Sequence, residues 1–303
     1  MSLTVQQIAS NPAFLPALAS FGMQMKDVYV RNQRLAGNFG FHRRWLMSQA
    51  ALALYLDPAD TLTVSRLVEV LKDLGVASPN TIRDFMTELE AYHFIEQDPA
   101  FESRRPRYWR PLPVVIEVLV EWFAANLAIL DRLDGQDRVR CFISAPDQIA
   151  CLQPRFARSC IADRRWLEPP ERVAFLQRSI AGGLVMDHIA LLTVCAKRED
   201  DRFMVTAIDA HAIASEVQIS RTHLQRTLKK VIEAGGLGWQ GKAFESDMWV
   251  DGAFIDEYCG WQAVKSHHLS VALGVRTKTW TGSMAQGRDY FDIRLGFAHQ
   301  VIF

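Results

Sequence analysis

The stretch that decides the fold is SRLVEVLKDLGVASPNTIRDFMTELEAYHFIEQD, residues 65–98. Ser65 can cap a helix that ends at Gly75, because short polar side chains cap helix starts and glycine favours helix ends. After a short turn, a second helix carries four apolar residues on one face, the spacing typical of an amphipathic helix. These residues are Ile82, Phe85, Met86 and Leu89. The stretch therefore predicts two helices joined by a turn.

Further elements are predicted on both sides of this stretch. They are a helix over 43–56, an extended piece at 62–64, a hairpin made from 94–97 and 108–109, and a helix over 112–133. Pro58 explains the end of the first of these helices, since proline stops a helix. The predicted order is helix, strand, helix, turn, helix, hairpin and a long helix.

A second stretch, DAHAIASEVQISRTHLQRTLKKVIEAGGLGW at residues 209–239, repeats this order. The predicted elements are helices over 187–197, 209–217, 220–234 and 252–273, a strand at 203–205, and a hairpin from 237–242 and 248–250. Ser220 caps the helix over 220–234, and two glycines end it. Residues 290–297 alternate apolar and polar, which predicts one late strand.

Short matches in a shared order indicate an internal duplication. QIA at 7–9 matches QIA at 148–150, AFES at 100–103 matches AFES at 243–246, and Trp109 matches Trp249. A period this long is typical of a duplicated domain, not of a solenoid of short repeats. Residues 134–137 are polar and contain a glycine, so we expect one domain over 1–135 and a second over 136–303.

The two quoted stretches resemble the winged helix-turn-helix fold, in particular MarR-type bacterial transcription regulators. The resemblance implies a mainly α fold with small β-hairpin wings, present here as two tandem units. In that fold the third helix enters the major groove and the wing contacts the DNA backbone or minor groove. Family members usually carry one unit and dimerise, so the resemblance implies either a pseudo-dimeric monomer or a homodimer.

The outward faces of the two third helices identify the candidate DNA contacts. On the second helix, Thr222, Gln225 and Arg226 suit base edges, and Lys229 and Lys230 suit phosphates, with Arg221 at the helix start. On the first helix the candidates are Asn80 and Arg83, but Asp84, Glu88 and Glu90 lie near and would repel phosphate. The first wing adds Arg104, Arg105 and Arg107, which suit a narrow minor groove or phosphates. A solvated surface is the alternative interpretation of each group.

Composition limits the other function classes. The 303 residues include 34 basic and 34 acidic side chains, so the net charge is zero and gives no global attraction to nucleic acid or membranes. The N-terminus has no signal-peptide pattern, and five cysteines without a C-x-x-C pair favour reduced thiols and a cytoplasmic protein. The apolar run 114–130 contains two glutamates, which favours a buried helix over a membrane span. Eight arginines between 138 and 180 are either a phosphate-facing patch or intramolecular ion pairs.

The sequence favours no enzyme, metal site or cofactor. The GxGxxG pattern at 236–241 follows a helix and precedes a strand, the reverse of a dinucleotide-binding motif. The histidines lack zinc-hydrolase spacing. MarR-type proteins often bind small aromatic effectors, and Trp45, Trp122, Phe123 and Trp261 lie on helices that could line such a pocket; the hydrophobic core is the favoured interpretation of these rings.

The leading hypothesis is a double-stranded DNA-binding transcriptional regulator, with a small aromatic effector as an additional partner. Tandem winged helices also serve as protein-interaction scaffolds, and the neutral net charge together with the acidic first helix favours that alternative. A replication initiator built from two winged helices is a further DNA-binding alternative.

Overall fold

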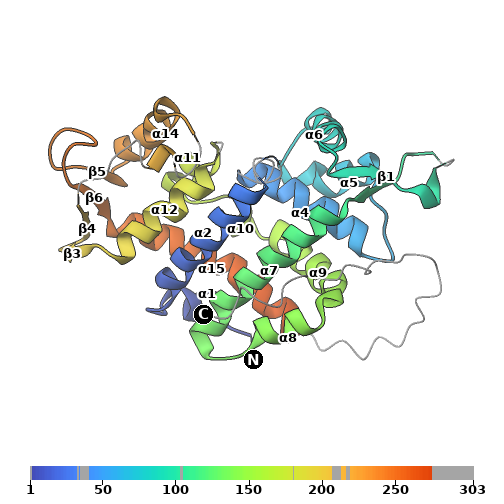
Figure 1. The fold of residues 1–303 in the computed structure, drawn as a ribbon, viewed down its shortest axis with the longest axis horizontal. Helices are drawn as coiled ribbons and strands as arrows, with labels where there is room; N and C mark the ends of the chain where they lie inside the picture. Colours follow the sequence, from blue (N-terminus) through green and yellow to red (C-terminus); the bar gives the residue numbers. More distant parts are fainter. Residues whose placement is uncertain are drawn as a thin grey trace.

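The computed structural model describes residues 2–32, 34, 41–102, 105–179, 181–206, 213–215 and 219–274. The protein is mainly helical and contains two small antiparallel sheets. Figure 1 shows the two sheets on opposite sides of a central group of helices. The predicted helix over 209–217 lies mostly outside the described residues, although 213–215 are helical, and the predicted strand at 290–297 lies entirely outside them.

The first half of the chain forms the predicted helices and hairpin with small shifts at their ends. The strand predicted at 62–64 is wrong, because Thr63 caps a helix that begins at Val64. The elements of this half are α1 Val5–Ala9, α2 Phe14–Arg31, α4 His42–Leu56, α5 Val64–Leu71, the single turn η1 Lys72–Leu74, α6 Pro79–Ala91, β1 Ile95–Gln97, the turn η2 Pro99–Phe101, β2 Trp109–Pro111 and α7 Pro113–Asp134. The prediction that Ser65 caps α5 is wrong. Thr63 is the cap, because its hydroxyl accepts the N–H of Arg66 at 3.1 Å. Gly75 ends the segment in a left-handed conformation, φ 65°.

The second half has more elements before its predicted unit. They are α8 Arg138–Ser144, the turn η3 Pro146–Gln148, α9 Ile149–Ala162, α10 Arg164–Leu167, α11 Glu171–Gln177, α12 Gly182–Val194, β3 Lys197–Glu199, β4 Arg202–Val205, α14 Arg221–Glu233, β5 Leu237–Trp239, β6 Met248–Asp251 and α15 Gly252–Gly274. The predicted bounds 187–197 are wrong for α12. The helix begins earlier because the chain turns sharply at Gly182, where a Cβ would lie 1.7 Å from the carbonyl oxygen of Leu176. It ends earlier because Lys197 belongs to β3.

The two sheets share one hairpin register. In the first sheet Ile95 pairs with Pro111 and Gln97 with Trp109; in the second, Leu237 pairs with Val250 and Trp239 with Met248. The second sheet has the strand order β3-β4-β6-β5. The predicted match of Trp109 with Trp249 is wrong by one residue, because Met248 occupies the register position of Trp109. Both of these side chains are buried.

Helices α6 and α14 are built alike. Ser78 accepts the N–H of Thr81 at 3.2 Å, and Ser220 accepts the N–H of His223 at 3.2 Å, so each helix begins at a serine cap. Each has 13 residues and leads through a residue with positive φ to the first strand of its hairpin. The buried faces also correspond in spacing. They are Ile82, Phe85, Met86 and Leu89 on α6, and Leu224, Thr227, Leu228 and Val231 on α14.

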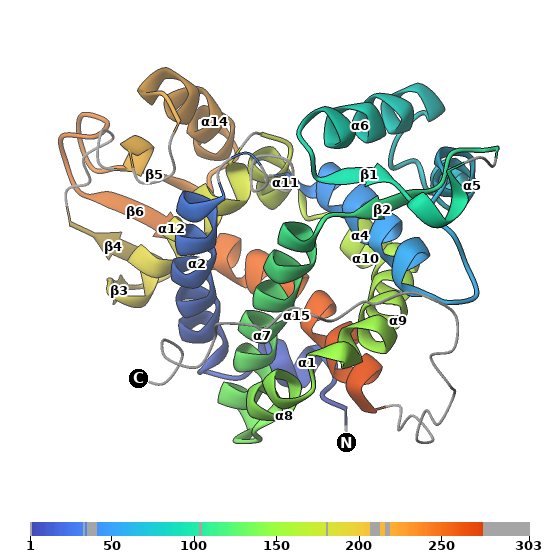
Figure 2. The ribbon, with the colours of Figure 1, turned by 45° about the vertical axis from the view of Figure 1, so that its right-hand side comes forward.

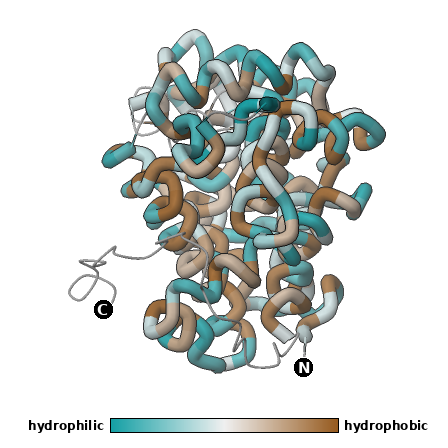
Figure 3. The backbone as a smooth tube through the Cα atoms, turned by 90° about the vertical axis from the view of Figure 1, so that its right-hand side faces the viewer, coloured by the Kyte–Doolittle hydropathy of each residue, from teal (hydrophilic) through white to brown (hydrophobic). Residues whose placement is uncertain are grey.

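Helices from the two halves of the chain pack on each other. Helix α2 packs on α12 and α4 packs on α9, while α1 packs on α15 and α8 on α7. A continuous hydrophobic core therefore includes residues of both halves. Figures 1 and 2 show α6 and α14 projecting from one end of the molecule, opposite the end that holds α1 and α8. Figure 3 shows more hydrophilic residues at the end with α6 and α14 and hydrophobic segments in the middle.

Helix α7 is the one described helix whose length and composition would allow it to cross a membrane. Half of its most apolar stretch is buried inside the structure. It packs against α2 and α8, and Glu121 on its surface pairs with Arg31 of α2 at 2.6 Å. In this structure α7 thus serves as a core helix between elements from both halves.

Candidate nucleic-acid interface and central cavity

Helix α14 turns an apolar face to the protein and a polar face to solvent. The predicted contact residues on this helix are all exposed. They are Arg221, Thr222, Gln225, Arg226, Lys229 and Lys230. The buried residues of α14 lie on the other side of the helix, which packs against α11. The outward face predicted from helical spacing is therefore the outward face of the structure, and it carries four cations.

The contacts of these side chains leave them available to a partner. A guanidinium nitrogen of Arg226 lies 3.3 Å from Nδ1 of His223, one turn earlier. Nζ of Lys229 lies 3.7 Å from the carboxylate of Glu233, and both side chains are more than half exposed. Exposed pairs of this kind contribute about 0–1 kcal/mol, so a phosphate could displace Glu233. Within the described residues, Lys230 forms no ion pair.

Helix α6 presents a different surface. Its two predicted contact residues bind each other, with Arg83 donating to Oδ1 of Asn80 at 2.8 Å. Asp84 is exposed, and Glu88 accepts a two-pronged pair of hydrogen bonds from Arg44 of α4. Because carboxylates repel phosphate, this face suits a nucleic acid less well than the exposed face of α14.

The first wing is divided by the limits of the described residues. Arg104 lies outside them, whereas Arg105 and Arg107 are described and exposed. Arg107 lies 3.8 Å from the carboxylate of Glu90 on α6. The second wing carries Lys242, which pairs with Glu245 at 2.6 Å. The positive charge of the first wing is thus placed beside an acidic helix.

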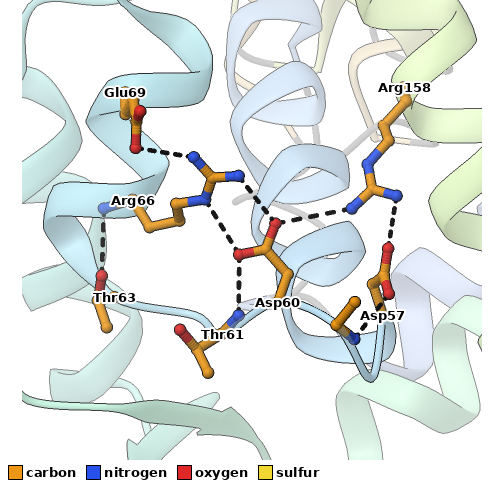
Figure 4. A network of polar contacts seen from close by, with 8 residues as sticks. Asp57, Asp60, Thr61, Thr63, Arg66, Glu69 and Arg158 are labelled. Atoms are coloured by element: carbon orange, nitrogen blue, oxygen red, sulfur yellow. Dashed lines mark hydrogen bonds and ion pairs between the residues drawn. The ribbon is translucent and has the colours of Figure 1, made fainter.

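The arginine-rich region between 138 and 180 consists largely of intramolecular ion pairs. Arg158 of α9 contacts Asp57 at the end of α4 and lies 3.7 Å from Asp60, which also binds Arg66 at 3.0 Å (Figure 4). Burial raises the pKa of Asp60, but the hydrogen bonds and charges of its partners, chiefly Arg66, outweigh burial and lower the pKa overall. This network fastens α9 to the segment that leads into α5.

Five other arginines of this region also form ion pairs within the protein. The pairs are Arg138 with Asp131 and Asp134, Arg140 with Asp137, Arg164 with Glu168, Arg165 with Asp163, and Arg172 with Asp251 and Glu257. Of the two interpretations that the sequence left open, the structure therefore supports intramolecular ion pairs over a phosphate-facing patch.

A cavity of about 190 Å³ lies where helices α2, α4, α7, α12 and α15 meet. Trp45, Trp122 and Trp261, three of the four aromatic residues considered for a pocket, line it. Phe123 does not line the cavity and is fully buried in the core. The remaining wall is mainly aromatic and aliphatic, which is typical of small-molecule sites.

Two charged residues in this cavity, the half-buried Asp187 and the buried Lys265, were not predicted from the sequence. Asp187 of α12 accepts a hydrogen bond from the hydroxyl of Tyr258 at 2.6 Å, and burial raises the pKa of Asp187 to about 6. Lys265 of α15 is 4% exposed, and burial lowers its pKa to about 8. The available signal was a single lysine within the long apolar part of its helix.

His42, at the start of α4, is a third titratable group in the cavity wall. Burial lowers its pKa to about 4, so the imidazole is neutral at pH 7. Its ring packs edge-on against Trp166 and Trp261. Neither here nor elsewhere in the described part of the chain is a group of three His, Cys, Asp or Glu side chains arranged to hold a metal ion.

Comparison of the chain with protein-family models, with curated proteins and with solved structures finds no match.

Proposed function

We propose that this protein is a double-stranded DNA-binding transcriptional regulator in which α14 is the principal major-groove helix. The observation that carries the proposal is the exposed face of α14, where Thr222, Gln225 and Arg226 stand among cations. Amide and guanidinium groups recognise adenine and guanine edges, and lysines bind phosphates. The serine cap and buried apolar face hold this helix rigidly, as groove reading requires.

The proposed architecture is a tandem pair of winged helix-turn-helix units within one chain. The matched caps, buried faces and hairpin registers of the α6 and α14 regions support a duplication. The packing of helices across the two halves supports a pseudo-dimeric monomer. By chain order, α2 corresponds to α9 and α4 corresponds to α12. The contact of α2 with α12 is therefore the counterpart of the contact of α9 with α4. Such reciprocal packing is expected if two copies of an intertwined dimer were joined into one chain.

The placement of α6 and α14 at one end of the molecule suits a single duplex that passes across both (Figure 2). Two winged helices bound to one duplex read half-sites about one helical turn apart. Because the exposed faces of α6 and α14 differ in charge, we expect unequal half-sites. The α14 half-site is specific in sequence, and the α6 half-site contributes little.

The proposal is tested by selecting bound fragments from genomic DNA and measuring the affinity of the selected duplex by fluorescence anisotropy at several salt concentrations. Arg226→Ala should cost about 1–3 kcal/mol and relax one base position. Lys229→Ala should weaken all duplexes alike and reduce the salt slope by about 1. Arg164→Ala is the matched control, because Arg164 is exposed and, within the described residues, its ion pair is with Glu168, the residue that ends α10.

Two outcomes would contradict parts of this proposal. Equal, sequence-independent losses from Arg226→Ala and Lys229→Ala would show that Arg226 does not read bases. Failure to enrich any fragment would favour the second candidate function, a protein-interaction scaffold. Asp84 and Glu90 on the exposed face of α6 favour that candidate, since they suit a basic protein partner better than DNA. Enrichment of repeated sites at a replication origin would instead identify an initiator.

A further inference from the structure

The central cavity gathers polar atoms that lack partners. Nε2 of His42, Nε1 of Trp166 and Oε1 of Gln262 are buried and form no hydrogen bond within the described part of the chain. All three residues line the cavity. A buried polar atom without a partner costs roughly 1–3 kcal/mol, and such atoms are rare in folded proteins. These three atoms have almost no accessible surface, so they stand behind the aromatic lining, and a bound molecule has to be recognised by other groups of the cavity wall.

Lys265 is the charged group of this site. Its Nζ lies 4.7 Å from the ring centre of Phe21 and 5.4 Å from that of Trp122, where both rings stabilise a cation. Among the described residues, none accepts a hydrogen bond from this ammonium and no carboxylate lies within 4.0 Å of it. The nearby Asp187 acts on it through charge alone and is itself bound by Tyr258. The ammonium therefore has three donors and no acceptor in the cavity wall.

Aromatic rings connect the two polar ends of the cavity. Trp122, beside Lys265, has its ring centre 5.9 Å from that of Trp45, and Trp45 lies 5.2 Å from Trp166 beside His42. The volume of about 190 Å³ exceeds the roughly 150 Å³ of an engineered apolar cavity that takes up benzene. One aromatic ring with a short polar chain therefore fits between the two ends.

We propose that this cavity binds an aromatic monocarboxylate, a single ring on a short acid chain. The carboxylate accepts hydrogen bonds from Lys265, and the ring packs against Trp45 and Trp122. An anion is favoured over a cation because Lys265 already occupies the aromatic cage with positive charge, while Asp187 is engaged by Tyr258. This site does not depend on the proposed DNA contacts, which lie on other elements.

The experiment compares three ligands of one shape and different charge on the full-length chain. They are 3-phenylpropionate, 3-phenylpropanamide and 3-phenylpropylamine, titrated by calorimetry and by tryptophan fluorescence, since tryptophans line the cavity. We expect the acid to bind at least tenfold tighter than the amide and the amine to bind most weakly. Lys265→Met should weaken the acid about 10- to 100-fold. The exposed Lys72→Met is the matched control and should leave binding unchanged.

Several results would overturn the proposal. These are tighter binding of the amine than of the acid, equal binding of acid and amide, binding of none of the three, or unchanged acid binding by folded Lys265→Met. If Lys265→Met fails to fold, the double variant Lys265→Met with Asp187→Asn removes both charges together. If neither variant folds, the ranking of the three ligands on the unaltered protein decides the question.

Discussion

Helices α6 and α14 share a backbone design and differ in surface charge. When their matched buried residues are superposed along the chain, Arg226 stands where α6 has Asp84, and Lys230 stands where α6 has Glu88. The buried positions remain mostly apolar in both helices because they hold each unit to the core. The exposed positions are free of that constraint, so the charge on one helix can reverse while the fold is kept.

Two acidic side chains of α6 form ion pairs within the protein. Glu88 binds Arg44 of α4, and Glu90 attracts Arg107 of the wing, so α6 is joined to two neighbouring elements. Lys230, the counterpart of Glu88, is exposed and forms no ion pair in the described part of the chain. Under the proposed function, α6 supports the structure and α14 contacts the DNA.

Truncation of the matched core residues should give the largest effect and tests whether the units are structurally equivalent. Met86 and Leu228 are both buried, at 1% and 3% exposure. Met86→Ala and Leu228→Ala should each lower the free energy of unfolding by about 2–5 kcal/mol. Urea unfolding followed by circular dichroism and by fluorescence should show one transition for each variant, because the core is continuous between the halves. Two separate transitions, with only one shifted, would show that the units unfold independently.

The amphipathic helices and their ends could be predicted because their signals are local. Apolar spacing identified the buried face of α6, and Ser220 was correctly identified as the cap of α14. The bounds of α12 were not predicted correctly because its own apolar residues lie on all faces of the helix and give no clear periodicity. Its first residue is set by a close backbone approach at Gly182, which depends on the preceding loop.

The cavity could not be predicted from the sequence because distant segments create it. Gly22 of α2 lies so close to α12 that a Cβ there would be 2.7 Å from the Cβ of Asp187. Lys265 enters from the last described helix, and His42 comes from α4. No local pattern relates these residues, although the sequence did identify Trp45, Trp122 and Trp261 as candidate lining.

Acidification should reveal a second difference between the halves, because α4 begins with the buried His42 and α12 begins with Gly182. Burial lowers the pKa of His42 from 6.5 to about 4, so between these values the unfolded chain binds a proton that the folded protein excludes. The His42 contribution to stability is therefore present above pH 6.5 and is lost as the pH falls towards 4, by about 3 kcal/mol.

Asp187 acts in the opposite direction over nearly the same range. Its pKa is raised to about 6, so the folded protein gains stability from this group as the pH falls from 6 to 3.8. We expect the two contributions to cancel in part in the unaltered protein. His42→Gln removes the His42 contribution and leaves the others, so the unfolding free energy of this variant relative to the unaltered protein should rise by about 3 kcal/mol as the pH falls from 6.5 to 4. A constant difference across urea titrations in that range would contradict the assignment.

The smallest effect is expected from moving one cation of α14 onto α6. Asp84 is exposed and forms no ion pair within the described residues, so Asp84→Arg breaks no contact and places an arginine where α14 has Arg226. If one duplex passes across both helices, the exchange removes a repulsion and adds a phosphate contact. Affinity for the selected duplex should rise by about tenfold at low salt, and the salt slope should steepen by about 1.

Asp147→Arg is the matched control for this exchange, because Asp147 is exposed in the turn between α8 and α9, far from the end that carries α6. It makes the same change in net charge, so an equal gain from both variants would indicate a general charge effect and not a contact at α6. An unchanged affinity for Asp84→Arg would place the duplex on α14 alone. The difference between the two variants therefore measures whether α6 lies against the bound duplex.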